Sequence, residues 1–289
     1  MEYPVALQRE VHAYLERLRF SAEPSTEGLE EAMRYSLLAG GKRIRPVLAL
    51  ATAESLGHQP AEVLPLAAAI ELIHTYSLIH DDLPAMDDDE LRRGQPTCHV
   101  AYGEDVAILA GDGLFAEAIR HVLVSQEGEP ARVLAALRHL VSAVSVSGMV
   151  GGQYVDVKAA GEFDEAALRH LHELKTGRQI AASIACPLFL CGADETATMG
   201  FRRYAAELGV LFQIVDDILD VTGDEVALGK PQGSDERLGK RTYVSVFGLE
   251  RARRLARSSH GKARAALADT GRPTRTLEQI TDYILTRDT

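Results

Sequence analysis

The sequence predicts an all-α protein, a large bundle of helices. Apolar residues recur at helical spacing along most of the chain, and no stretch combines sustained alternation with β-branched residues and hairpin turns. No Gly/Ser-rich, Pro-rich or single-sign tract separates two halves of the 289 residues. A chain of this length can bury a sizeable core, so we expect a single domain spanning residues 1–289.

The helices are predicted from their apolar spacing and from the residues that end them. Paired glycines at Gly40 and Gly41 permit positive φ and end the second helix. Pro84 cannot continue a helix, and we expect the resulting bulge to return Asp87 toward Asp81. The predicted helical segments are Val5–Phe20, Leu29–Leu38, Val47–Leu56, Leu66–Leu83, Val106–Leu123, Val133–Val150, Leu168–Leu190, Phe247–Ala268 and Leu277–Leu285.

Composition excludes some classes of protein. A net charge of −11 and a pI of about 5.4 argue against a nucleic-acid binder that relies on a broad basic surface. The N-terminus has no basic region followed by an apolar core, and no uncharged run approaches a membrane span. We therefore expect a cytoplasmic protein without stable membrane association. The cysteines, Cys98, Cys186 and Cys191, have neither disulfide-framework nor zinc-site spacing.

Two acidic clusters each follow an apolar helical run. The first holds five aspartates between Asp81 and Asp89, which repel one another by roughly 4 kcal/mol per close pair at an effective dielectric near 20. Alone, such an acidic run is usually a solvated face or a loop at a helix end. In the second, Asp216 and Asp220 share a helix face with Asp217 beside them. Two such clusters indicate a shared task, and divalent metal binding by hard oxygen ligands is the chemistry they favour.

These motifs resemble a known family. Asp81-Asp82-x4-Asp87 with Arg92-Arg93, and Asp216-Asp217-x2-Asp220, are similar to the two aspartate-rich motifs of the trans-isoprenyl diphosphate synthases (polyprenyl synthetases), most of all the bacterial farnesyl diphosphate synthases. The resemblance runs from about Glu30 to the C-terminus and implies the isoprenoid synthase fold, a helical bundle around a deep central cavity. It also implies a homodimer.

The resemblance implies that the aspartates hold three Mg²⁺ ions on an allylic diphosphate. Asp81, Asp87 and Asp216 would be the principal ligands, supported by Asp82, Asp217 and Asp220. Such ions would stabilise the departing diphosphate.

A second anion site is suggested by Gly40-Gly41-Lys42-Arg43-Ile44-Arg45-Pro46, which opens a helix. Cations and free amides at such a point can meet an anion, although solvated charges would look the same. By resemblance, this is the site for the diphosphate of isopentenyl diphosphate, bound by Lys42, Arg45, His74 and Arg93. Arg43 has no clear counterpart in the family motif.

Further cations are implied for the allylic diphosphate. A lysine inside an apolar helix needs a partner, and the resemblance assigns Lys175 to a kink aimed at this group, with Thr176 and Gln213 near the reacting carbon. Four glycines and a proline between Val221 and Lys240 predict a mobile loop. Lysines of this loop match family residues that close over diphosphate. The cations implied are Arg92, Lys175, Lys230 and Lys240, and Arg287 resembles the family's C-terminal basic residue.

The implied reaction joins isopentenyl diphosphate to dimethylallyl and then geranyl diphosphate, giving (2E,6E)-farnesyl diphosphate. Tyr76 lies five residues before Asp81, about 7.5 Å along a helix. An aromatic residue at this position resembles the residue that limits the product to C15 in the bacterial enzymes. Ser77, four residues before Asp81, faces that aspartate better on an ideal helix.

Other functions remain open at this point. A geranylgeranyl or geranyl diphosphate synthase shares every motif. A terpene cyclase shares the first motif, but its second usually contains Asn or Asp, Ser or Thr, and Glu at wider spacing. A His-Asp phosphohydrolase would leave Lys42, Arg45 and the second cluster unexplained. Non-catalytic regulatory subunits lose aspartates that are present here.

Overall fold

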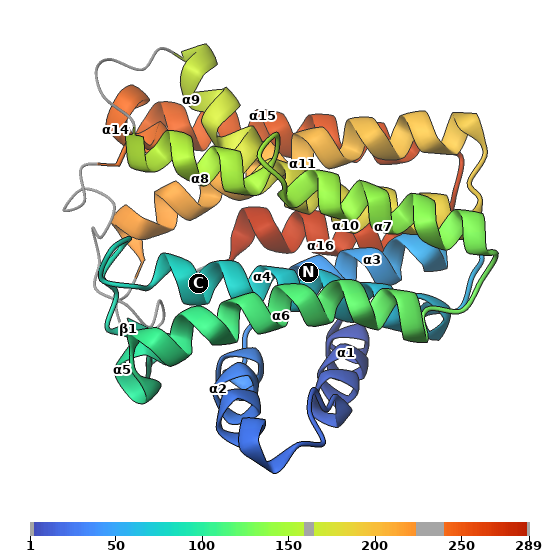
Figure 1. The fold of residues 1–289 in the computed structure, drawn as a ribbon. Coiled ribbons are helices and arrows are strands. Elements are labelled where there is room, and N and C mark those ends of the chain that lie inside the picture. Colours follow the sequence, from blue (N-terminus) through green and yellow to red (C-terminus); the bar gives the residue numbers. More distant parts are fainter. Residues whose placement is uncertain (1–2, 159–164, 224–239, 288–289) are drawn as a thin grey trace.

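The computed structural model describes residues 3–158, 165–223 and 240–287. Helices dominate these residues, and the all-α prediction is confirmed (Figure 1). The α-helices are α1 (Val5–Arg17), α2 (Glu27–Leu38), α3 (Ile44–Ser55), α4 (Leu64–Asp81), α5 (Cys98–Tyr102), α6 (Glu104–Ser125), α7 (Pro130–Val144), α8 (Met149–Lys158), α9 (Glu165–His172), α10 (Arg178–Cys191), α11 (Glu195–Thr222), α14 (Tyr243–Phe247), α15 (Leu249–Ala268) and α16 (Arg275–Thr286).

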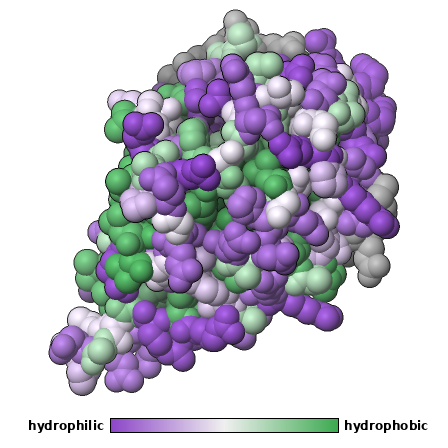
Figure 2. Space-filling view, turned by 90° about the vertical axis from the view of Figure 1, so that its right-hand side faces the viewer, coloured by the Kyte–Doolittle hydropathy of each residue, from purple (hydrophilic) through white to green (hydrophobic). Residues whose placement is uncertain are grey.

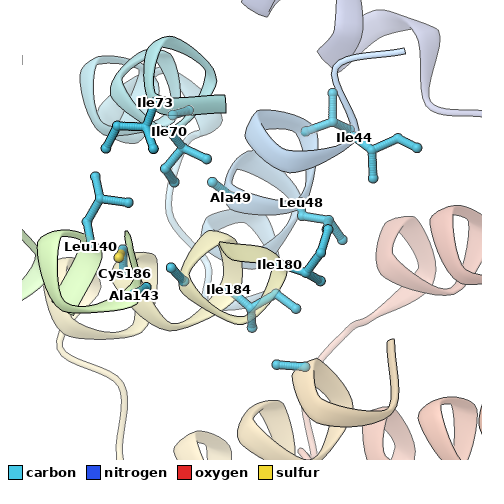
Figure 3. Close-up of a cluster of buried hydrophobic side chains, with 14 of the residues drawn as sticks. Ile44, Leu48, Ala49, Ile70, Ile73, Leu140, Ala143, Ile180, Ile184 and Cys186 are labelled. Carbon is cyan, nitrogen blue, oxygen red and sulfur yellow. The ribbon is translucent and has the colours of Figure 1, made fainter. Parts of the chain in front are cut away.

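The core forms where α3, α4, α7 and α10 meet (Figure 3). Ile70 of α4 points toward Ala49 of α3 and Ile73 points toward Leu140 of α7, which lies beside Cys186 of α10. α3 and α4 bury apolar residues on nearly every side, as expected of helices inside a large protein. The polar end of α4 is therefore held on a rigid, fully packed element.

The other helices pack around these core helices. α6 packs along α4, and α11 packs along both α10 and α15. α1 and α2 project below α4 and α6, whereas α11 and α15 lie above them (Figure 1). α16 packs between α15, α11 and α3, which brings the C-terminal helix close to the start of α3.

Two predicted helices are interrupted. Val133–Val150 divides into α7 and α8 at a turn, where a Cβ on Gly148 would lie 2.1 Å from the carbonyl oxygen of Ala143. Leu168–Leu190 divides into α9 and α10 at a π-helical segment, Glu173–Gly177. The apolar pattern continues through both breaks, so periodicity alone does not indicate them; the second coincides with the kink that the resemblance implies at Lys175.

The first acidic cluster follows α4 outside the helix. α4 ends at Asp81, three residues before Pro84, so the chain forms a turn rather than a bulge within a helix. The backbone N–H of Asp87 donates to the carbonyl oxygen of Asp81 at 2.9 Å. The predicted return of Asp87 toward Asp81 is confirmed. A two-residue antiparallel pair, β1 (Leu91–Arg92) and β2 (Gln95–Pro96), follows the turn.

Two described segments are long and apolar enough to cross a membrane, judged by length and composition alone. They are Pro60–Asp81 and Pro130–Lys158, whose apolar windows are 67% and 44% buried within the protein. Neither segment is free of charges, but the apolar window of each contains at most two charged residues. The first contains the core helix α4, and a buried core helix meets the same criterion as a membrane span.

Candidate active site

A cavity of about 870 Å³ lies between the end of α4 and α11 and is walled further by α8, the π segment and Lys240–Thr242. Two of the described site residues that were predicted, Lys42 and Asp82, do not line it, and the predicted Lys230 lies outside the described residues. The predicted residues that do line it are Arg45, His74, Tyr76, Ser77, Asp81, Asp87, Arg92, Arg93, Lys175, Thr176, Gln213, Asp216, Asp217, Asp220 and Lys240.

The aspartates of the first cluster have different environments. Asp81 and Asp87 line the cavity, and their carboxylates accept hydrogen bonds from Gln153 (2.7 Å) and Lys240 (2.8 Å) respectively. Asp82 is buried instead, and Arg92 Nε donates to its two oxygens at 2.8 and 2.9 Å. Asp82 thus holds Arg92 at the cavity wall rather than facing the cavity itself.

The second cluster is divided in the same way. Asp217 is buried, and its carboxylate accepts hydrogen bonds from Gln213 Nε2 (2.7 Å) and from the backbone N–H of Tyr243 (2.6 Å). Asp216 forms an ion pair with Arg287, whose guanidinium lies 4.4 Å from the ring centroid of Phe212. Asp217 therefore joins α11 to α14, while Asp216 is the more exposed carboxylate at the cavity.

Lys175 reaches the cavity because its backbone leaves the regular helix. The π segment carries it against α8, where a Cβ on Gly152 would lie 2.4 Å from the Lys175 backbone nitrogen. Lys175 Nζ donates to Asp156 Oδ2 at 2.5 Å. Burial lowers the pKa of Lys175, but the charges of Asp156 and Asp81 outweigh it, so its pKa is raised overall and the ammonium stays charged.

A third group of side chains, Arg45, His74 and Arg93, lies deeper beside α3. Arg45 Nη1 lies 3.3 Å from His74 Nε2, and burial, followed by the charge of Arg45, lowers the pKa of His74 well below its usual value. His74 is therefore neutral and can both donate and accept hydrogen bonds. Arg93 donates to the carbonyl oxygen of Gly40, and a Cβ on Gly41 would lie 2.6 Å from its guanidinium carbon.

The sequence analysis missed several side chains of this site. Gln153 and Asp156 lie on one face of α8, three residues apart, and contact Asp81 and Lys175. His172 lines the cavity and stacks on Tyr243, and burial lowers its pKa to about 4. The sequence did contain a signal for the first two: Gln153 and Asp156 follow the glycines of α8 and are three residues apart, so they share one face of the helix.

Comparison with known proteins identifies the family. The family model described as polyprenyl synthetase matches residues 26–279, most of the chain. The chain belongs to the polyprenyl synthetase family. This polyprenyl synthetase is 45% identical over 255 residues to the farnesyl diphosphate synthase of Geobacillus stearothermophilus, an alignment that covers 87% of this chain and 84% of that protein.

Other relatives of this polyprenyl synthetase bear different names. The chloroplastic geranylgeranyl pyrophosphate synthase of Capsicum annuum is 44% identical over 264 residues, 90% of this chain and 72% of that protein. The crystal structure of a Helicobacter pylori geranyltransferase complexed with magnesium and isoprenyl diphosphate superposes with a TM-score of 0.86 at 31% identity, covering 99% of this chain and 97% of that one. The fold and the prenyltransferase class are thereby shown, while the relatives differ in product.

Removing the charge of Asp81 is expected to stabilise the folded protein. Burial raises the pKa of Asp81 from 3.8 to about 6; the positive charge of Lys175 opposes this shift, and the like charge of Asp87 adds to it. The folded state thus holds this proton more tightly than the unfolded state, and stability is lost as pH rises from about 4 to about 6. At pH 7.5 with EDTA, Asp81→Asn should raise Tm, by about 2–4 °C per kcal/mol recovered.

The matched control for this experiment is Asp88→Asn. Asp88 is exposed and has φ of 54°, a conformation that asparagine also tolerates. Its thermal midpoint, followed by circular dichroism, should stay within about 2 °C of the wild type, because surface substitutions usually change stability by less than about 0.5 kcal/mol. A lower Tm for Asp81→Asn than for Asp88→Asn would contradict the electrostatic explanation.

Proposed function

We propose that this polyprenyl synthetase condenses isopentenyl diphosphate with dimethylallyl diphosphate and then with geranyl diphosphate, giving (2E,6E)-farnesyl diphosphate and diphosphate. One observation carries the proposal. Carboxylates from two parts of the chain, Asp81 at the end of α4 with Asp87 in the turn after it, and Asp216 with Asp220 on α11, line one cavity together with lysines and arginines. The family match through residues 26–279 supports treating the chain as one catalytic domain.

The carboxylates fit magnesium that is shared with substrate oxygens. Among the residues described, no three His, Cys, Asp or Glu side chains lie close enough to hold a metal ion by themselves. Mg²⁺ commonly uses one or two carboxylates, several waters and substrate phosphates. We propose that three ions bind with the diphosphate, mainly through Asp81, Asp87 and Asp216, with Asp220 beside them. The magnesium and isoprenyl diphosphate bound to the Helicobacter pylori relative support this assignment.

Magnesium, when bound, would neutralise the diphosphate and make it a better leaving group. The chain adds fixed positive charge from Arg92, Lys175 and Lys240, and we expect the lysines to exchange their carboxylate partners for diphosphate oxygens. The allylic carbon–oxygen bond breaks, and the double bond of isopentenyl diphosphate attacks the carbocation to form the new carbon–carbon bond. The departed diphosphate takes the proton that is lost.

Isopentenyl diphosphate is assigned to the Arg45, His74 and Arg93 group, with Lys42 beside it. Lys42 does not line the cavity in the described structure, and its ammonium lies 5.7 Å from the ring centroid of Tyr283. Rotation of this flexible side chain would bring its charge toward the diphosphate. Thr176 and Gln213 line the cavity and are assigned to the region of the reacting carbon.

The deciding experiment is incubation of the purified full chain with Mg²⁺, isopentenyl diphosphate and dimethylallyl diphosphate, followed by analysis of product chain length. A C15 diphosphate is expected. A C20 or C10 product would keep the reaction and replace the product assignment, in line with the geranylgeranyl alternative that the Capsicum annuum relative supports. Absence of condensation with both dimethylallyl and geranyl diphosphate would overturn the proposal.

Shortening Tyr76 is expected to lengthen the product. The Tyr76 ring lies in the cavity wall and makes edge contacts with Phe115 and His80, at centroid distances of 5.2 and 5.7 Å. Tyr76→Ala removes the ring and should shift the main product from C15 to C20 or longer. Ser77→Ala is the control, because Ser77 also lines the cavity but contributes only a small hydroxyl. An unchanged C15 product from Tyr76→Ala would show that Tyr76 does not limit the product length.

We further propose that the protein is a homodimer. α6 exposes apolar side chains, with Leu109 55%, Leu123 56% and Val124 71% accessible, and Leu134 of α7 is 56% accessible. Figure 2 shows apolar side chains gathered along the left edge of the molecule. Exposed apolar side chains that gather on one side of a protein are typical of protein interfaces.

Light scattering should therefore give twice the chain mass of 31.4 kDa. Leu109→Asp should weaken association of the two chains by at least tenfold, because it would bury an unpaired charge in the interface. Met199→Asp, at a side chain 56% exposed on α11, serves as the control and should remain dimeric. A monomeric wild type at micromolar concentration would refute the dimer.

A further inference from the structure

Arg43 is the middle cation of the Lys42–Arg45 segment, yet it does not face the cavity. Its backbone adopts φ of 54°, which turns its side chain away from the direction that Arg45 takes. Arg43 Nη1 donates to Glu71 Oε1 and Nη2 donates to the carbonyl oxygen of Leu37, each at 2.6 Å. The Arg43 and Glu71 side chains are only 1% and 2% exposed, so this ion pair is fully buried.

Glu71 belongs to the same face of α4 as His74, one turn away. His74 in turn contacts Arg45, at 3.3 Å. The buried pair thus connects the loop before α3 to the part of α4 that bears a substrate-binding side chain. Neither Arg43 nor Glu71 lines the cavity.

The same loop is also held by its backbone carbonyl groups. Arg93 donates to the oxygen of Gly40, Gln8 Nε2 donates to that of Gly41 at 3.0 Å, and Tyr3 Oη donates to that of Lys42 at 2.7 Å. Three consecutive carbonyl oxygens are therefore fixed by side chains from elsewhere in the chain. Tyr3 is itself buried, with its ring centroid 4.7 Å from that of Tyr283.

We propose that Arg43 and Glu71 are a positioning pair which, together with Tyr3, fixes the loop so that Lys42 and Arg45 meet the diphosphate of isopentenyl diphosphate. The inference rests on the proposed function and adds residues that do not touch the substrate. A buried ion pair contributes little net stability compared with apolar residues, because both charges must leave water. Here the ion pair instead fixes the conformation of the loop that carries Lys42 and Arg45.

The test is steady-state kinetics of Glu71→Gln and Tyr3→Phe with each substrate varied in turn. Glu71→Gln preserves shape but removes the charge that orients Arg43, and KM for isopentenyl diphosphate should rise at least tenfold, which corresponds to about 1.4 kcal/mol. Tyr3→Phe removes one hydroxyl and should raise it about threefold. KM for geranyl diphosphate should stay within twofold in both, since Arg92, Lys175 and Lys240 are undisturbed.

Tyr14→Phe provides the matched control. It removes another tyrosine hydroxyl near the N-terminus, one that is hydrogen-bonded to His121 at 2.9 Å and lies away from the loop. Both KM values should equal those of the wild type. A purely structural role for Arg43 and Glu71 would lower Tm without separating the two KM values.

The outcomes distinguish this inference from the proposed function. A wild type that does not condense the substrates refutes the proposed function. An active wild type whose Glu71→Gln and Tyr3→Phe variants keep the wild-type KM for isopentenyl diphosphate overturns the positioning role. If Glu71→Gln does not fold, Tyr3→Phe decides the question, because it removes a single oxygen from a residue whose ring packing is retained.

Discussion

Carboxylates gathered at one cavity repel one another, and the surrounding structure is arranged to balance that repulsion. Each aspartate nearest the cavity has a polar or cationic neighbour: Gln153 for Asp81, Lys240 for Asp87 and Arg287 for Asp216. These neighbours come from α8, from the segment before α14 and from the end of the chain. Segments distant in sequence therefore meet at this cavity, and their polar and cationic side chains offset the repulsion between its carboxylates.

A division of roles within each Asp-Asp pair follows from the same constraint. Asp82 and Asp217 are buried and accept hydrogen bonds from protein donors, whereas Asp81 and Asp216 are less buried; all of these except Asp82 line the cavity. A buried carboxylate of this kind orients its donors, here Arg92 and Gln213, and has fewer lone pairs left for a metal ion. The neighbouring carboxylate remains available for exchange between a protein cation and a ligand. Adjacent residues of one type thus perform structural and chemical tasks side by side.

Much of the site was predictable from local patterns, whereas its internal contacts were not. The spacing of Asp216 and Asp220 on a helix, and the effect of Pro84 on Asp87, depend on backbone geometry that sequence carries directly. The direction of Arg43 depends on one residue with positive φ and on Glu71, 28 positions away. The glycines Gly148, Gly151 and Gly152 indicate the break between α7 and α8, which the apolar pattern alone does not, and Lys230 lies outside the described residues.

The π segment at Glu173–Gly177 has a consequence for how this site arose and how it can be lost. A π turn contains one residue more than the α turn it replaces, so it is equivalent to a single-residue insertion. Deleting one residue there would restore a continuous helix from α9 into α10 and rotate one part against the other by about 100°. Lys175 would then leave Asp156, and Gly177 would lose its close approach to Gly209. In evolutionary terms, a one-codon change separates an ordinary long helix from a helix that presents an ammonium to a cavity.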